Sequence, residues 1–149
     1  MKAWILVLFA SLCAVPCAAF AVARADLPAE VKTLSVNGYD MAYVERGSGP
    51  VLVLVHGALS DYRTWSALMN DLSAENRVIA VSLRHYYPEH WDGHGDDFSL
   101  YEHARDVAAF IEALDSGPVH LIGHSRGAGV ALLAAVMLPE RVRSLVLAD

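Results

Sequence analysis

One serine of this chain stands in a setting that favours nucleophilic chemistry. Ser125 lies in the run Val119-His120-Leu121-Ile122-Gly123-His124-Ser125-Arg126-Gly127-Ala128-Gly129, where an apolar segment leads into Gly-x-Ser-x-Gly. This is the sequence form of a nucleophile elbow, which holds a serine on a sharp turn between a strand and a helix. A side chain at Gly123 or Gly127 would crowd such a turn. We therefore predict that Ser125 is a catalytic nucleophile.

The segment after the serine, residues 126–138, predicts the helix of this elbow. It is apolar nearly all round and is followed by Pro139, so we expect a buried helix that ends there. A helix N-terminus carries partial positive charge, which favours negative charge developing on a nearby substrate.

A second motif lies upstream of the elbow. Residues 51–55 are a continuous apolar run, as expected of a strand buried on both faces of a parallel sheet. The run leads into His56-Gly57-Ala58, for which a plain turn between a strand and a helix is the alternative interpretation.

A strand ending in His56-Gly57, paired with the later elbow, resembles the α/β-hydrolase family, in particular its serine esterases and lipases. The resemblance covers nearly all of residues 31–149. It implies an oxyanion hole made of two backbone N–H groups, here those of Ala58 and Arg126. Losing one such donor typically costs about 3 kcal/mol of transition-state stabilisation.

The remaining apolar periodicity predicts the elements that position these motifs. Residues 31–36 and 41–44 flank Asn37-Gly38 and predict an antiparallel hairpin. Further strands are expected at 77–81 and 141–148, and helices after Ser60 or Asp61 and from the capping box Ser99-Leu100-Tyr101-Glu102. Strands that alternate with helices predict an α/β fold with a mostly parallel sheet covered by helices on both faces.

The resemblance also implies a catalytic triad in the chain order Ser, acid, His. No histidine follows Ser125, and the sequence stops at Asp149, directly after the expected last strand. A serine hydroxyl is a weak nucleophile without an adjacent base. In addition, a sheet that ended with the strand 141–148 would leave the edge of this apolar strand unpaired, which favours aggregation. We therefore expect residues 26–149 to be the N-terminal part of a longer hydrolase domain, truncated after this strand.

The histidines upstream of Ser125 are not expected to replace the missing base. His56 and His124 belong to the two motif turns, and His120 is expected to pack in the sheet. His103, early in a helix, is expected to face solvent, while His85, His90 and His94 lie in the loop 82–98. The resemblance leaves open whether Asp149 is the catalytic acid. Some members of the family place this acid directly after the strand that corresponds to residues 141–148, and most place it one strand later.

The first 25 residues predict a secretory signal peptide. Lys2 is followed by an apolar core, and Ala23-Arg24-Ala25 resembles a cleavage site. Cleavage after Ala25 would remove both cysteines and would change the formal net charge from −6 to −8, because Lys2 and Arg24 leave with no acidic residue. We expect a secreted or periplasmic protein with no stable membrane span after cleavage, although an uncleaved anchor is the alternative. The acidic balance argues against nucleic acid as a partner.

The loop 82–98 mixes imidazoles and carboxylates without the spacing of a metal site, so we expect no metal and no cofactor. Its aromatic residues favour an apolar wall or gate of a substrate site. The function expected is an exported serine hydrolase that acts on a small carboxylic ester or lactone. A serine at the elbow argues against the dehalogenases and epoxide hydrolases, which use aspartate there, but not against haloperoxidase, acyltransferase or lyase chemistry. The alternatives are a catalytically inactive, truncated binding module and a hydrolase completed by an unknown partner chain.

Overall fold

The computed structural model describes residues 30–148, so the predicted signal peptide and Asp149 lie outside the described residues. The strands are β1 (Lys32–Val36), β2 (Tyr39–Arg46), β3 (Val51–Val55), β4 (Arg77–Val81), β5 (Val119–His124) and β6 (Val142–Ala148). The helices are the 3-10 turn η1 (Tyr62–Trp65), α1 (Ser66–Leu72), α2 (Leu100–Ala113) and α3 (Arg126–Met137).

The six strands form one sheet in the order β1-β2-β4-β3-β5-β6. β1 and β2 pair as the predicted antiparallel hairpin, whose turn residues Asn37 and Gly38 have φ angles of 44° and 81°. β2 is also antiparallel to β4, while β4, β3, β5 and β6 run parallel. The predicted α/β fold with a mostly parallel sheet is therefore confirmed.

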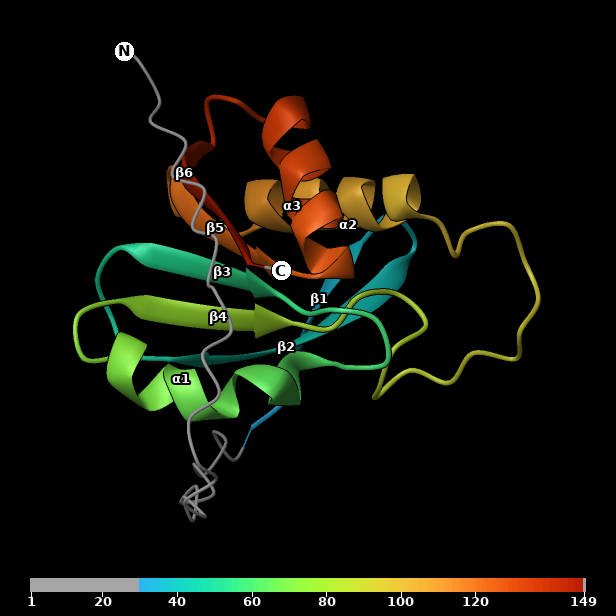
Figure 1. The fold of residues 1–149 in the computed structure, drawn as a ribbon, viewed down its shortest axis with the longest axis horizontal. Coiled ribbons are helices and arrows are strands. Elements are labelled where there is room, and N and C mark those ends of the chain that lie inside the picture. The colour runs from blue at the N-terminus through green and yellow to red at the C-terminus, as the bar shows by residue number, and fades with distance from the viewer. Residues whose placement is uncertain (1–29, 149) are drawn as a thin grey trace, which may run out of the picture.

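Helices lie on both faces of the sheet (Figure 1), with η1 and α1 on one face and α2 and α3 on the other. β3 lies at the centre and its five residues are all buried. Successive side chains of a strand point to opposite faces, so Val53 and Val55 pack with α2 and α3, while Leu52 and Leu54 pack with η1 and α1. The continuous apolar run thus has the two-sided burial that the sequence predicted.

The observed burial of the elbow helix α3 differs from the predicted burial. α3 packs inward through Val130, Ala131 and Ala134, but its outer side chains Leu132 and Val136 are 45% and 70% exposed. The prediction of a helix buried all round is wrong for this face, because no element within residues 30–148 covers it. In the same described range, no helix is long and apolar enough to cross a bilayer.

The chain order of the strands brings three loops to one edge of the sheet. After β3 the chain passes to β4 on one side and later to β5 on the other. The segments that follow β3, β4 and β5 therefore start beside one another at the carboxyl ends of these parallel strands. In open α/β sheets this reversal of strand order is the usual position of a binding crevice.

Candidate active site

Ser125 occupies the sharp turn that joins β5 to α3. Its φ and ψ angles are 52° and −120°, a region that residues with a side chain rarely adopt. The turn is held by two backbone hydrogen bonds: the Ser125 N–H donates to the Ala148 carbonyl oxygen at 2.8 Å, and the Ala128 N–H donates to that of Ser125 at 2.8 Å. The side chain of Ser125 is exposed. Strand, strained serine and helix thus have the arrangement of a nucleophile elbow.

Two glycines allow the backbone segments around this turn to approach closely. A Cβ atom at Gly123 would stand less than 3.0 Å from the carbonyl oxygen of Gly127. A Cβ atom at Gly127 would come equally close to the carbonyl oxygens of Val55 and His56 at the end of β3. Because all these neighbours are backbone atoms, no side-chain movement could make room.

The segment after β3 lies against the elbow. A Cβ atom at Gly57 would stand 3.0 Å from His124 Nδ1 and 3.2 Å from Ser125 Cβ. Ala58 follows Gly57, and both Ala58 and Arg126 line one cavity. Among the hydrogen bonds of residues 30–148, none uses the backbone N–H of either residue. The two residues that the resemblance implies as donors therefore line one cavity, and neither backbone N–H has a hydrogen-bond partner within residues 30–148.

His56 is a structural residue, as predicted. It is fully buried; its Nδ1–H donates to the Gly57 carbonyl oxygen at 2.7 Å, and its Nε2 accepts the Leu83 N–H at 3.1 Å. Both bonds require the neutral ring, and burial lowers the pKa of His56 accordingly. The imidazole thereby joins the end of β3 to the segment after β4 and orients the backbone that leads to Ala58.

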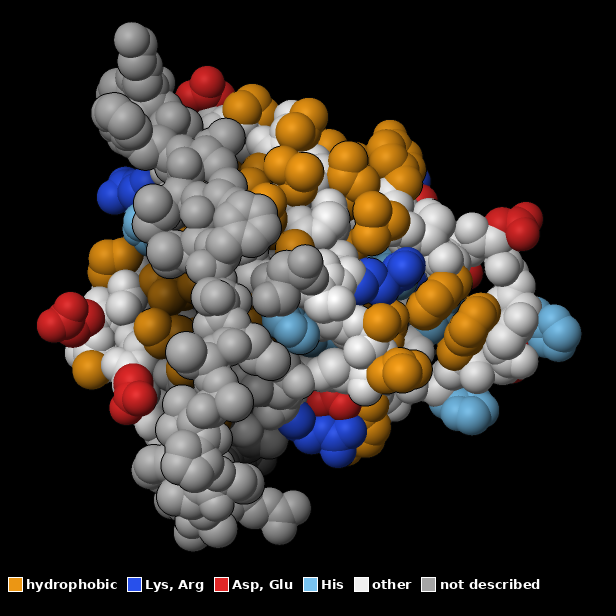
Figure 2. Space-filling model, in the orientation of Figure 1, with side chains coloured by type: hydrophobic (Ala, Val, Ile, Leu, Met, Phe, Trp, Pro, Cys, Tyr) orange, Lys and Arg blue, Asp and Glu red, His pale blue; other side chains and the backbone are white. Residues whose placement is uncertain are grey.

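The cavity shared by Ala58 and Arg126, here named the elbow cavity, has a volume of about 500 Å³. Its lining residues are Ala58, Leu59, Ser60, Asp61, His85, Tyr86, Tyr87, Trp91, Phe98 and Arg126. Trp91 and Phe98 stack with ring centroids 4.6 Å apart. The expected aromatic wall from the loop 82–98 is confirmed. Figure 2 shows hydrophobic side chains gathered at this end of the molecule, with arginine or lysine and histidine side chains between and around them.

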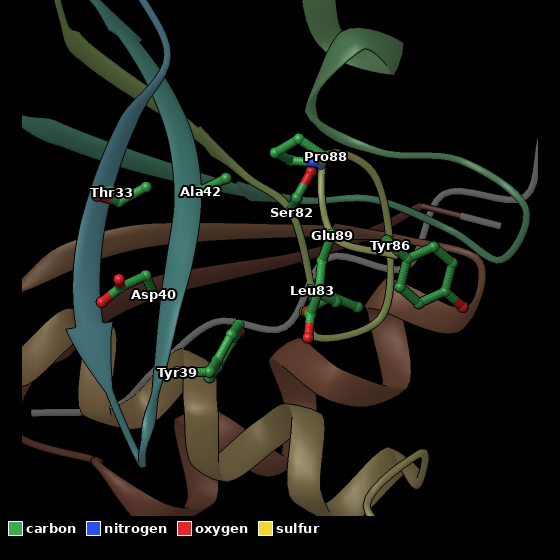
Figure 3. Close-up of a pocket in the computed structure, with 9 residues that line it drawn as sticks. All are labelled: Thr33, Tyr39, Asp40, Ala42, Ser82, Leu83, Tyr86, Pro88 and Glu89. Atoms are coloured by element: carbon green, nitrogen blue, oxygen red, sulfur yellow. The ribbon is translucent and has the colours of Figure 1, made fainter. Parts of the chain in front are cut away.

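A second cavity, of about 300 Å³, lies between the hairpin and the segment after β4 (Figure 3). Its lining includes Tyr39, Asp40, Ser82 and Glu89. Tyr86 lines both cavities and packs edge-on against His56 at 4.7 Å between ring centroids. This tyrosine is therefore shared by the two cavities.

A buried ion pair, which the sequence analysis missed, anchors the loop beside the elbow cavity. Arg84 donates from Nε and Nη2 to the two carboxylate oxygens of Asp106, at 2.9 and 3.0 Å. Asp106 lies on α2 and is fully buried; it also accepts a hydrogen bond from Asn37 Nδ2 at 3.0 Å. A carboxylate on the inward face of a predicted helix signals that some cation must pair with it, but sequence alone does not say which.

His103 is fully buried, so the prediction that it faces solvent is wrong. The cap Ser99, which accepts the Glu102 N–H at 3.0 Å, sets the phase of α2. His103 then lies one turn before Val107, on the face that packs inward. Burial, together with the charge of Arg126, lowers the pKa of His103 to about 4. The spacing of His103, Val107 and Ile111 was the signal that could have shown this.

No base contacts the serine within the described part of the chain. His85 Nε2 pairs with Asp97 Oδ1 at 2.8 Å, and His90 and His94 are exposed on the loop. Among residues 30–148, no imidazole or carboxylate forms a hydrogen bond with Ser125 Oγ, and no group of three metal-ligating side chains could hold an ion. Asp149, the residue left open as the acid, lies outside the described residues.

Comparison with known proteins identifies the family to which this fold belongs. The sequence model of the family described as alpha/beta hydrolase fold matches residues 50–149. The chain is 37% identical over 132 residues to the dihydrolipoyllysine-residue acetyltransferase component of the acetoin cleaving system of Pseudomonas putida, covering 83% of this chain and 33% of that protein. It is 35% identical over 111 residues to 2-(acetamidomethylene)succinate hydrolase of Mesorhizobium japonicum, covering 70% and 37%.

Among solved structures, an epoxide hydrolase from Vigna radiata superposes with a TM-score of 0.74 at 29% identity, covering 79% of this chain and 39% of that one. The chain therefore spans between 33% and 39% of the length of these three proteins. The match of the family model over residues 50–149, together with this superposition, shows that the chain belongs to the α/β-hydrolase fold family.

Proposed function

We propose that this protein is a serine hydrolase that cleaves a small carboxylic ester or lactone. The observation that carries the proposal is the strained Ser125 at φ 52°, whose turn lies against Gly57 beside a cavity lined by Ala58 and Arg126. Strain of this kind persists where the surrounding structure enforces it, and it is concentrated at functional sites. A relative that is itself named a hydrolase supports the same class of reaction.

In the proposed reaction, Ser125 Oγ attacks the carbonyl carbon of the substrate, and the hydroxyl proton passes to a histidine base. The resulting alkoxide accepts hydrogen bonds from the backbone N–H groups of Ala58 and Arg126. As this intermediate collapses, the protonated histidine gives its proton to the leaving oxygen, which departs as the alcohol and leaves an acyl group on Ser125. The neutral histidine then takes a proton from water, which attacks the acyl group and releases the acid, and the proton returns to Ser125 Oγ. The histidine and its acid partner are proposed to lie outside residues 30–148.

The elbow serine also separates this proposal from the chemistry of the Vigna radiata relative. An epoxide hydrolase shares the fold, but fold alone does not assign a reaction. Ser125, rather than an aspartate, favours acyl transfer to a hydroxyl group over opening of an epoxide by a carboxylate.

Labelling with a tagged fluorophosphonate tests the proposal, because this reagent bonds to serines that are activated for attack. The protein at its native full length should be labelled on the peptide that carries Ser125, and Ser125→Ala should abolish labelling. Ser73→Ala, at the end of α1, is the matched control and should retain the label. Label that persists in Ser125→Ala, or a folded protein that stays unlabelled, would overturn the proposal and favour the inactive binding module.

We also propose that the protein is exported and that its signal peptide is removed after Ala25. The mature protein recovered from its source should then begin at Asp26. N-terminal sequencing decides the matter, because an uncleaved anchor would leave Met1 or Lys2 at the N-terminus.

A further inference from the structure

We propose that the elbow cavity selects substrates with a free carboxylate and that the guanidinium of Arg126 binds this group. The inference rests on the proposed function, in which Ser125 attacks an ester held in the same cavity. It adds a substrate class, namely half-esters of short dicarboxylic acids.

The first observation is that Arg126 lacks an anionic partner within residues 30–148. The neighbouring arginines are paired, since Arg63 donates to Asp61 at 2.7 and 2.8 Å and Arg84 pairs with Asp106. In Arg126, by contrast, Nη2 lies 3.4 Å from His103 Nδ1, and the buried Nε has no hydrogen-bond partner in the described part of the chain.

The second observation is that the surroundings of Arg126 do not compensate its charge. The guanidinium carbon lies 5.0 Å from the centre of the Phe98 ring, so one face of the group is covered by an apolar side chain. His103 does not balance this charge either, because an imidazole is neutral or cationic, and this one is neutral above its pKa of about 4. A cation that is partly buried without an anion is costly, and an anionic ligand would offset this cost.

The third observation concerns the one carboxylate in the lining of the elbow cavity. Asp61 accepts hydrogen bonds from the side chain and the backbone N–H of Arg63, which hold its pKa below its usual value. Its charge is therefore already balanced by Arg63. The rest of the wall is largely aromatic, including Tyr86, Trp91 and Phe98, and suits an apolar alcohol or linker.

The position of Arg126 also limits the length of the substrate. Its backbone N–H is one of the two proposed oxyanion donors, and the same residue is part of the lining of the elbow cavity beside Phe98, whose ring its guanidinium contacts. The scissile carbonyl and the carboxylate must therefore be separated by a short chain. A planar guanidinium matches a carboxylate with two parallel hydrogen bonds, so an acyl group that ends in a carboxylate meets both requirements.

Two esters of equal length test this selectivity in the protein at its native full length. Mono-4-nitrophenyl glutarate carries a terminal carboxylate, whereas 4-nitrophenyl pentanoate ends in a methyl group. We expect kcat/KM to favour the glutarate ester, and Arg126→Gln to lower the ratio of the two values by about 10- to 100-fold, as expected for hydrogen bonds to a charged group. Arg126→Lys should retain part of the preference. Using the ratio cancels any effect of the substitution on the oxyanion hole.

Arg105→Gln is the matched control, because Arg105 is exposed on α2 and pairs with Glu102 outside the elbow cavity. It should leave the ratio unchanged. An equal fall in Arg105→Gln would mean that general positive charge, rather than Arg126, sets the preference. A ratio that does not change in Arg126→Gln would overturn the inference.

A binding measurement separates this inference from the proposed function. Calorimetric titration of Ser125→Ala with monobenzyl glutarate and with benzyl pentanoate needs no turnover. Tighter binding of the glutarate, lost in Ser125→Ala/Arg126→Gln, supports the carboxylate site even if Ser125 does not react with fluorophosphonate. Labelled Ser125 with equal binding of both esters would leave the hydrolase standing and refute the site, and absence of binding by either ester would also refute it.

Discussion

Gly123 on β5 and Gly127 on α3 meet backbone to backbone, with no room for a Cβ atom at Gly123 beside the Gly127 carbonyl oxygen. The same Gly127 lies against the carbonyl oxygens at the end of β3. Through these two contacts, the start of α3 packs closely against β5 and the end of β3. The position of Ser125 is therefore set by backbone packing and not by its own side chain.

Substitution of Gly127 by alanine should destabilise the protein strongly. The added Cβ would overlap backbone oxygen atoms, and overpacking of this kind costs about 1–3 kcal/mol or more. Gly129→Ala, two residues further along α3, is the control. There the added Cβ would first meet the Leu100 side chain at 3.2 Å, and alanine favours the helix by up to about 1 kcal/mol. Urea unfolding should show a large loss for the first variant only, and equal losses would contradict this account.

The strained backbone of Ser125 predicts that glycine and alanine at this position differ in their effect on the stability of the protein. Glycine tolerates a φ of 52°, whereas alanine does not. Ser125→Gly should therefore be more stable than Ser125→Ala by about 1 kcal/mol, the strain relieved less the extra entropy of glycine in the unfolded chain. Thermal or urea unfolding of the two variants measures the difference. If Ser125→Ala were the more stable, the turn would not be strained.

The buried pair of Arg84 and Asp106 should be far more important for stability than an exposed pair on the same helix. Asp106→Asn leaves the Arg84 cation without its main partner, which for a buried pair costs about 3 kcal/mol or more. Arg105→Gln breaks the exposed pair with Glu102 and should cost less than about 1 kcal/mol. Similar urea midpoints for the two variants would show that Asp106 is not buried in the folded protein.

Acidification should destabilise the protein well before its carboxylates titrate. Burial lowers the pKa of both His56 and His103, the latter to about 4, so below pH 6.5 the unfolded chain binds more protons than the folded one. The free energy of unfolding should then fall by up to about 1.4 kcal/mol per pH unit for each histidine. Urea midpoints at pH 7.5, 6 and 5 measure this fall, and His103→Gln should reduce its slope. Equal wild-type midpoints at pH 7.5 and 5 would refute it.

Much of the fold could be predicted because local sequence signals and tertiary structure agree. Asn37-Gly38 forms the hairpin turn, and Ser99 caps α2 by accepting the Glu102 N–H. The elbow could also be predicted locally, because the spacing of Gly123, Ser125 and Gly127 indicates a sharp turn that has no room for side chains at the two glycines. In these cases the cause lies within a few residues of its effect, except that Gly127 also meets the backbone of Val55 and His56, which are distant in the sequence.

The errors and omissions concern features that depend on distant parts of the chain. Arg84 and Asp106 are 22 residues apart, and no local pattern pairs them. His103 is the exception, because its spacing from Val107 and Ile111 places it on the inward face of α2, so local periodicity alone could have predicted its burial. The exposure of Val136 depends on what packs against α3, which the apolar composition of the helix does not reveal.

The hydrogen bond from Asn37 to Asp106 joins residues that are 69 positions apart. Ribosomes add roughly 5 to 20 residues per second, so on the order of 3 to 14 seconds separate the synthesis of the hairpin turn from that of its partner on α2. A hairpin of two strands has little stability of its own in water. During translation the β1–β2 turn therefore exists for several seconds without the hydrogen bond that joins it to α2 in the folded protein.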